Sequence, residues 1–324
     1  MKAFTLDKPR GFALSAASDF YAGFIPGSGM AAAAVDNLTL AFRLDHTFEA
    51  VAVALRESGD SLVAEYCGTD DAGAVARQVA RMLGLDADGD AWLALGRRDP
   101  VVGALQAEFA GFFTAAKASP YDAAAWGVLS PRMNMRSAAR LKMAIAQAHG
   151  DEVRLQGRSH HVFPSPRQVL GIGTFPGLPT EKLERLHGIA NAALLGKLDA
   201  DRLRAMAPDD ALSELQTLRG VGPWTASHIL FRGAALHDAL PTAEPRVLHG
   251  LAHAYGIPSP SMETFERLSE GWRPCRMWVC ILLARHLREA GGWNDRRLAG
   301  ERGAMGRKAA PRASTGTGRS RPEG

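Results

Sequence analysis

The sequence predicts an α+β protein, in which a small antiparallel sheet domain with helices precedes an all-helical bundle. Two periodicities predict this order. Residues 1 to about 95 contain strand-length apolar runs, whereas apolar residues recur at helical spacing from there to about residue 293. The length is consistent with two units, because 324 residues suffice for two domains with ordinary hydrophobic cores. We place the boundary near "RRDP", which gives units 1–98 and 99–298 and a tail, 299–324.

Three segments of the first unit are predicted to be strands, and one is predicted to be a helix. The strands are "NLTLAFRLD" (37–45), "FEAVAVALRES" (48–58) and "SLVAEYCG" (61–68), and turn-forming residues separate the last two. In "AGAVARQVARMLGLD" (72–86), the apolar residues repeat at helical spacing. We therefore expect a small sheet with helices on one face.

The second unit contains eight helical segments separated by Pro and Gly breaks, which predicts a bundle of eight or so helices. The segments are 99–113, 121–129, 134–150, 180–196, 211–218, 223–233, 245–256 and 276–292.

Composition restricts the class of protein. An apolar content of 46% is ordinary for a soluble chain, and no apolar run approaches the roughly 20 residues of a membrane span. Charged residues near the N-terminus argue against an export signal. Three scattered cysteines, without metal-binding spacing, indicate a reducing compartment and no metal site. We expect a monomer in the cytoplasm, associated with the nucleoid, without a membrane partner.

The basic charge is concentrated at the C-terminus. The tail 299–324 holds six basic and two acidic residues, which accounts for the whole net charge of +4. It is rich in Gly, Ser, Pro and Arg, so we expect disorder. Such a tail attracts a polyanion, or it only keeps the chain soluble.

The most informative stretch is a glycine turn between two helical segments. Leu212, Leu215 and Leu218 give the first segment an apolar stripe. Pro223 suits the first position of the second helix and Gly233 its end. The pattern predicts a helix, a tight hairpin and a helix.

The hairpin is suited to bind an anion. Gly220 and Gly222 allow positive φ in the turn and close approach of another backbone. The N–H groups of Gly222, Trp224 and Thr225 begin the second helix, at the positive end of its dipole, which favours phosphate. A glycine turn without any ligand is the alternative.

Several motifs in register resemble a known family. "LQTLRGVGPWTA" (215–226) resembles the helix-hairpin-helix motif of the DNA glycosylase superfamily. "WRPCRMW" (272–278), "AAWGVLSPRMNMRSAARL" (124–141) and "FPSP" (163–166) resemble the bacterial DNA-3-methyladenine glycosylase II family. The order of elements is similar from roughly residue 100 to 290, and the N-terminal unit resembles the extra sheet domain of that family.

The resemblance implies a monofunctional DNA glycosylase, a hydrolase of base excision repair that flips alkylated purines out of the duplex and hydrolyses their N-glycosidic bond. Damaged double-stranded DNA is the implied partner, and the abasic product would pass to a separate endonuclease. The hairpin, Gly220 to Thr225 with Val221, would hold a DNA phosphate. The resemblance implies no required cofactor beyond a monovalent cation on the hairpin carbonyls.

The implied catalytic carboxylate departs from the family. Where the family has an aspartate, this chain has Glu244, directly before Pro245 at a helix start. Asp238 is the reserve carboxylate. The glutamate either serves in an adjusted pocket, or the chain is a catalytically impaired DNA-binding protein that recognises damage without releasing a base.

The resemblance also assigns the remaining site residues. Arg132 is the first choice for the wedge that fills the space left by the flipped base, and Met133 the second. Trp224 and His228 would line the base pocket. Trp224 stands where a related branch of the superfamily has a Schiff-base lysine, which argues against lyase activity.

Overall fold

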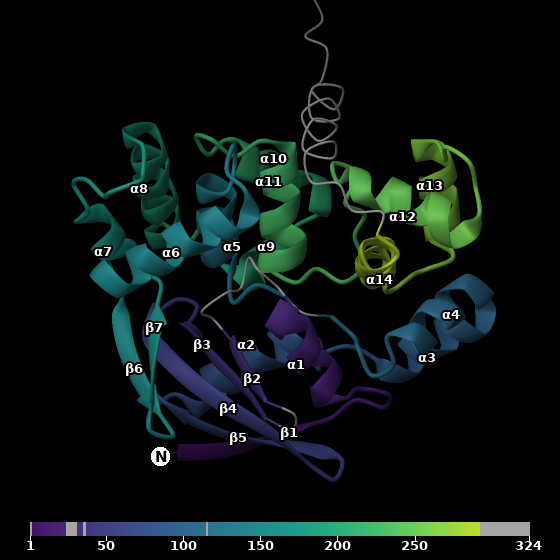
Figure 1. The fold of residues 1–324 in the computed structure, drawn as a ribbon, viewed down its shortest axis with the longest axis horizontal. Helices are drawn as coiled ribbons and strands as arrows, with labels where there is room; N and C mark the ends of the chain where they lie inside the picture. Colours follow the sequence, from purple (N-terminus) through teal and green to yellow (C-terminus); the bar gives the residue numbers. More distant parts are fainter. Residues whose placement is uncertain (1, 24–30, 35–36, 115, 292–324) are drawn as a thin grey trace, which may run out of the picture.

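The structure, a computed structural model, describes residues 2–23, 31–34, 37–114 and 116–291. Its N-terminal part is an antiparallel sheet of five strands in the spatial order β1-β5-β4-β3-β2 (Figure 1). The strands are β1 (Lys2–Asp7), β2 (Ala31–Ala34), β3 (Asn37–Arg43), β4 (Ala50–Ser58) and β5 (Ser61–Cys67). The three predicted strands are β3, β4 and β5, and β1 and β2 add the two edges.

Two helices, α1 (Leu14–Gly23) and α2 (Ala72–Leu83), cover one face of the sheet. The carboxylate of Asp71 caps α2 by accepting a hydrogen bond from the Ala74 amide, and Gly84 ends the helix at φ +73°. Val75 and Val79 of α2 are fully buried against alternate residues of the strands, such as Val53. This arrangement confirms the predicted sheet with helices on one face.

The bundle is not entirely helical, which corrects the prediction for the second unit. Two short strands, β6 (Asp151–Leu155) and β7 (Arg158–Val162), form an antiparallel hairpin. Its turn places Gln156 at φ +50° and Gly157 at φ +74°, the geometry of a two-residue hairpin loop. Leu155 and Val162 bury themselves against the second face of the N-terminal sheet. Most residues of these two strands are charged or polar, so the sequence shows no clear apolar alternation and the strands were not predicted.

The remaining elements are helices, and each helical segment predicted for the second unit overlaps at least one of them. They are α3 (Gly89–Arg98), α4 (Pro100–Glu108), α5 (Pro120–Leu129), α6 (Met135–His149), α7 (Pro166–Leu170), α8 (Thr180–Leu194), α9 (Ala200–Ala205), α10 (Pro208–Gln216), α11 (Pro223–His228), α12 (Pro245–Tyr255), α13 (Met262–Glu270) and α14 (Arg276–Glu289). A π-helical turn, Ile229–Gly233, continues α11. The predicted α+β class is therefore confirmed.

One continuous core joins the sheet to the helices. Trp278 of α14 is fully buried and packs its ring 5.2 Å from Trp92 of α3 and 5.1 Å from Phe113. The boundary between 98 and 99 stays a prediction. The proposed tail, 299–324, lies outside the described residues. Within the described part of the chain, no helix is both long enough and apolar enough to cross a membrane.

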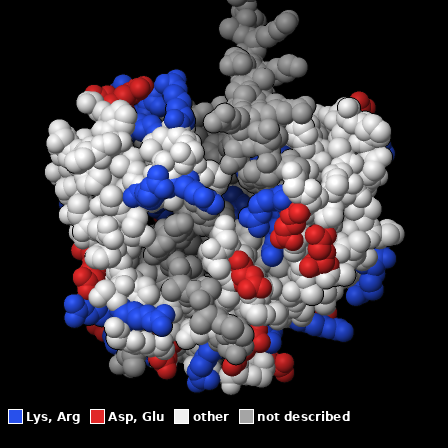
Figure 2. Space-filling view, in the orientation of Figure 1, with Lys and Arg blue, Asp and Glu red and all other residues white. Residues whose placement is uncertain are grey.

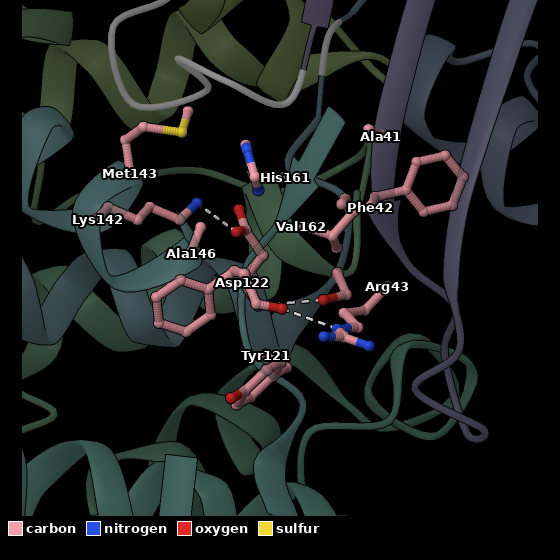
Figure 3. Close-up of a pocket in the computed structure, with 13 residues that line it drawn as sticks. Ala41, Phe42, Arg43, Tyr121, Asp122, Lys142, Met143, Ala146, His161 and Val162 are labelled. Carbon is pink, nitrogen blue, oxygen red and sulfur yellow. Dashed lines mark hydrogen bonds and ion pairs between the residues drawn. The ribbon is translucent and has the colours of Figure 1, made fainter. Parts of the chain in front are cut away.

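A pocket lies at the junction of β3, α5, α6 and β7 (Figure 3). Its charged groups are paired with one another or with nearby residues: Lys142 with Asp122, and Arg43 with Asp151 at 2.5 Å. Arg43 also donates from Nε to the carbonyl of Phe163 at 2.7 Å. We interpret this cluster as the polar joint between sheet and bundle, because its charges already have protein partners.

Candidate functional site

The predicted hairpin is present between α10 and α11. The Val221 amide donates to the Leu218 carbonyl at 2.9 Å and closes the turn. Gly222 is the N-cap of α11, and Pro223 occupies its first turn as the sequence indicated. The helical path runs on through the π-helical turn to Gly233, also as predicted. Leu215 is buried, and Leu212 and Leu218 pack partly buried against the core.

The two glycines of the turn have different roles. Gly220 has φ +87°, and a Cβ there would lie 2.7 Å from Cδ of Arg185. Gly222 is extended at φ −92° and ψ −179°, with open space where a Cβ would be. The prediction that both glycines provide positive φ is therefore wrong for Gly222. Gly222 instead leaves the turn without a side chain at the start of α11.

The start of α11 also carries the electrostatic features of an anion site. First-turn amides of a helix have no partner within the helix, and here they belong to Gly222, Trp224 and Thr225. The backbone of Gly222 is exposed, whereas Thr225 is buried. Figure 2 shows Lys and Arg side chains on the upper left of the face, together with Asp or Glu side chains at its top edge. The helix before the hairpin, α10, carries Asp209, Asp210 and Glu214 and no basic residue.

Glu244 caps α12 with its own side chain. Its carboxylate accepts from the Arg246 amide at 3.2 Å, and Oε1 also accepts from Nε of Arg246 at 2.6 Å. Nη2 of Arg246 donates to Oε2 of Glu244, which completes a bidentate pair. The Glu244 side chain is only 13% exposed. The longer glutamate thus folds back over its helix start and is held there by Arg246, which the sequence analysis did not single out.

The hairpin helix reaches the same carboxylate. Nε1 of Trp224 donates to Oε2 of Glu244 at 2.9 Å. One face of the indole is stacked on the His228 ring, with ring centroids 5.1 Å apart and planes inclined by 9°. The structure therefore brings together Trp224, His228 and Glu244, three residues that were selected separately from the sequence.

His228 is held neutral. Burial is the main reason that the pKa of its ring lies well below the usual value, and three neighbouring cations lower it further: Lys117, Arg232 and Arg246. Nε2 of His228 is buried and has no hydrogen-bond partner within the described ranges. Burial also lowers the pKa of Lys117 to about 7, although Asp122 lies 3.4 Å from its Nζ and opposes the shift. No sequence motif pointed to Lys117.

Asp238, the reserve carboxylate, has a different setting. Arg273 donates to Oδ2 of Asp238 at 2.5 Å, and Nε of Arg276 donates to Oδ1 at 2.7 Å. Both arginines belong to the "WRPCR" segment before and at the start of α14. Asp238 thus ties the loop after the π-helical turn to α14, and its oxygens are already held by two guanidinium groups.

The two wedge candidates differ in exposure. Arg132 is exposed at the tip of the loop 130–134, which we call the wedge loop, and has φ +59°. Met133 is partly buried and packs against Trp126 of α5. Asn134 caps α6 by accepting from the Ser137 amide at 2.8 Å. Geometry therefore favours Arg132 over Met133 for contact with a partner molecule.

Close packing sets the position of the wedge loop relative to the hairpin. Gly127 in the last turns of α5 lies against the Thr225 side chain of α11, and any Cβ at residue 127 would overlap it. Gly233 packs in the same way against the start of α5, where a Cβ would lie 2.7 Å from Cα of Pro120. The helix that ends in the wedge loop and the helix that begins at the hairpin thus run against each other.

Metal-binding groups do not cluster here. Within the part of the chain that the structure describes, no three His, Cys, Asp or Glu side chains are placed to hold a metal ion. Cys275 and Cys280 are buried as free thiols, and Cys67 is a partly exposed thiol.

Comparisons with known proteins agree on one fold. No family model matches the chain. It is 24% identical over 218 residues to a DNA-3-methyladenine glycosylase of Bacillus subtilis, covering 66% of this chain and 72% of that protein. It is 26% identical over 174 residues to DNA-3-methyladenine glycosylase 2 of Escherichia coli, covering 51% and 56%. A solved 3-methyladenine DNA-glycosylase from Archaeoglobus fulgidus superposes with a TM-score of 0.74 at 20% identity, over 88% of this chain and 98% of that one.

Proposed function

We propose that this chain, a member of the helix-hairpin-helix DNA-3-methyladenine glycosylases, removes alkylated purines from double-stranded DNA by hydrolysing the N-glycosidic bond. The observation that carries the proposal is the convergence of Trp224, His228 and Glu244 at the start of the hairpin helix. A glycosylase needs its strand anchor, its base pocket and its carboxylate side by side, and the contacts among these three residues support that assignment.

In the proposed reaction, the hairpin amides hold a backbone phosphate while the damaged nucleotide rotates out of the stack. Arg132 fills the vacated space in the duplex. The extruded base stacks on Trp224, whose opposite face rests on His228. Base stacking on an aromatic ring contributes roughly 1–3 kcal/mol in single-strand binding proteins.

Glu244 then promotes bond cleavage. As the bond from C1′ to the base nitrogen breaks, its electron pair goes to the base and positive charge develops on the sugar. The fixed carboxylate stabilises that charge. Water adds to C1′ and loses a proton, which leaves an abasic site. An alkylated purine already carries positive charge, so it departs without a strong general acid.

The impaired DNA-binding protein remains the second candidate, and one observation favours it. Glu244 already accepts hydrogen bonds from Nε, Nη2 and the amide of Arg246 and from Nε1 of Trp224. A carboxylate has about four acceptor positions. A water molecule can therefore be oriented by Glu244 only if one of these donors gives way.

Base release separates the two candidates. We would compare the wild type with Glu244→Gln on methylated duplex DNA, and measure binding to an abasic duplex in parallel. Glu263→Gln, at an exposed position of α13, is the matched control. Release that is lost only in Glu244→Gln, with abasic binding retained, supports the glycosylase. A folded wild type that binds the abasic duplex without releasing any base supports the binding protein.

The remaining expectations follow from the same proposal. A monovalent cation would bind carbonyls of the hairpin. Those of Leu218 and Gly222 accept one backbone hydrogen bond each and keep a second lone pair. The abasic product would pass to a separate endonuclease, and the protein would act as a monomer in the cytoplasm at the nucleoid.

A further inference from the structure

Lys182, in the first turn of α8, holds the base of the wedge loop. Its Nζ donates to the carbonyl of Leu129 at 2.5 Å and to the carbonyl of Pro131 at 2.8 Å. Leu129 is the last residue of α5, so one of these acceptors is a helix-end carbonyl without a partner in its own helix. A lysine ammonium at a helix C-terminus is also favoured by the helix dipole.

The wedge loop needs such support because of its backbone. Arg132 adopts φ +59°, a left-handed conformation that residues with a side chain seldom occupy. Asn134 fixes the far end of the loop as the cap of α6, and Lys182 fixes the near end. Between these two points the Arg132 side chain is exposed.

The charge of Lys182 is influenced by Arg132 of the wedge loop and by Arg185 of its own helix. Burial lowers the pKa of its amine, and the positive charges of Arg185 and Arg132 lower it further. Arg185 lies one turn along α8 on the same side, against Gly220 of the hairpin. One face of α8 therefore touches the wedge loop through Lys182 and the hairpin turn through Arg185.

We propose that Lys182 is a positioning residue that holds the wedge loop in the conformation that presents Arg132 to the duplex, so that base extrusion depends on it and strand anchoring does not. The inference rests on the proposed function, with Arg132 as the wedge. It predicts a selective defect. Extrusion costs least for a mispaired base, so loss of the wedge geometry should slow the enzyme on a well-paired lesion far more than on a mispaired one.

The experiment uses the full chain and two duplexes with the same methylated purine, one paired normally and one placed opposite a mismatch. Under single-turnover conditions, we expect Lys182→Met to release the paired base about tenfold more slowly and the mispaired base less than about threefold more slowly. Lys197→Met removes a charge beyond the other end of α8, from a side chain that has no hydrogen bond or ion pair with any of the described residues, and should change neither rate. An equal loss on both duplexes would overturn the proposal.

Two further variants guard against a folding defect. Lys182→Arg keeps a donor that can reach both carbonyls, so it should restore most of the rate on the paired duplex. In a double-mutant cycle, adding Lys182→Met to Arg132→Ala should cost little more than Arg132→Ala alone, because both act through the same side chain. Fully additive losses would show that Lys182 does not act through Arg132.

Extrusion can also be read without cleavage. 2-Aminopurine next to an abasic site or mismatch becomes fluorescent when it leaves the stack, and we expect a smaller increase with Lys182→Met than with wild type at saturating protein. This readout separates the two proposals. If the wild type releases no base but extrudes 2-aminopurine in a Lys182-dependent way, the proposed chemistry fails and the positioning role stands. If the fluorescence is the same for both proteins, the positioning role is wrong.

Discussion

Nε1 of Trp224 donates a hydrogen bond to Oε2 of Glu244 at 2.9 Å, which links the first turn of the hairpin helix to the N-cap of α12. A glutamate side chain places its carboxylate one methylene farther from the backbone than an aspartate does. Here the chain folds back onto the Arg246 amide and guanidinium, and the extra length is used within the helix cap. The contact with Trp224 then fixes the carboxylate against the hairpin.

Shortening this side chain tests whether the pocket is built for glutamate. In Glu244→Asp, the carboxylate withdraws by roughly 1.5 Å and loses its bond to Trp224. We expect base release to fall by about 100-fold, the usual cost of a displacement of about 1 Å in an active site, with abasic-DNA binding unchanged. Single-turnover release from methylated duplex measures it. An aspartate variant as fast as wild type would mean that the Trp224 contact has no part in catalysis.

The two glycines of the hairpin turn should respond differently to alanine. Gly220→Ala places a side chain at φ +87° against Arg185, so we expect a loss of about 1–2 kcal/mol in the free energy of unfolding. Gly222→Ala has an allowed backbone and open space, so stability should stay within about 0.5 kcal/mol of wild type.

DNA affinity provides the second half of that comparison. A methyl group on Gly222 stands at the first-turn amides and obstructs a phosphate, so Gly222→Ala should weaken binding to an abasic duplex by about tenfold or more. Urea unfolding and fluorescence anisotropy give the two quantities. Unimpaired binding by Gly222→Ala would show that no phosphate approaches the hairpin.

The neutral state of His228 predicts how stability depends on pH. Its folded-state pKa lies well below 6.5, whereas the unfolded chain has the ordinary value near 6.5. Below pH 6.5 the unfolded state therefore binds more protons, and the free energy of unfolding falls as pH falls, by at most about 1.4 kcal/mol per pH unit for this one group. The dependence fades over about one pH unit above 6.5, where the unfolded-state ring also loses its proton.

His228→Phe keeps a ring against Trp224 and cannot titrate. The difference in unfolding free energy between wild type and this variant should be nearly constant from pH 7 to 8. From pH 6.5 to 5.5, the wild type should lose stability relative to the variant. Urea unfolding at each pH measures it. A constant difference down to pH 5.5 would mean that His228 accepts a proton as easily in the folded state as in the unfolded chain.

Asp238 should prove structural. In Asp238→Asn, the guanidinium groups of Arg273 and Arg276 lose a charged partner, so we expect a loss of about 1–3 kcal/mol in stability. Base release at a temperature where the variant is folded should stay within about threefold of wild type. Thermal unfolding and single-turnover release measure the two effects. A stable Asp238→Asn without base release would move the catalytic role from Glu244 to Asp238.

The hairpin β6–β7 shows where sequence patterns were insufficient. Its turn, Gln156-Gly157, is a visible signal, but each strand is five residues long and most outward positions are charged or polar. Strands of this kind are defined by what they pack against. Leu155 and Val162 become an inward face only because the sheet offers Ala41, Ala52 and Ala54 opposite them.

The sequence by itself determined many of the local elements: three strands of the sheet, most of the long helices, the glycine turn and the proline that starts α11. These depend on residues within a few positions of one another, because periodicity and turn chemistry act over that range. Only the tertiary structure decided which side chains meet. Gly127 lets α11 approach α5, Glu244 turns back to Trp224, and Lys182 reaches the wedge loop from a helix more than fifty residues along the chain. Such contacts follow from how elements distant in sequence pack together, and local residue patterns carry no record of that packing.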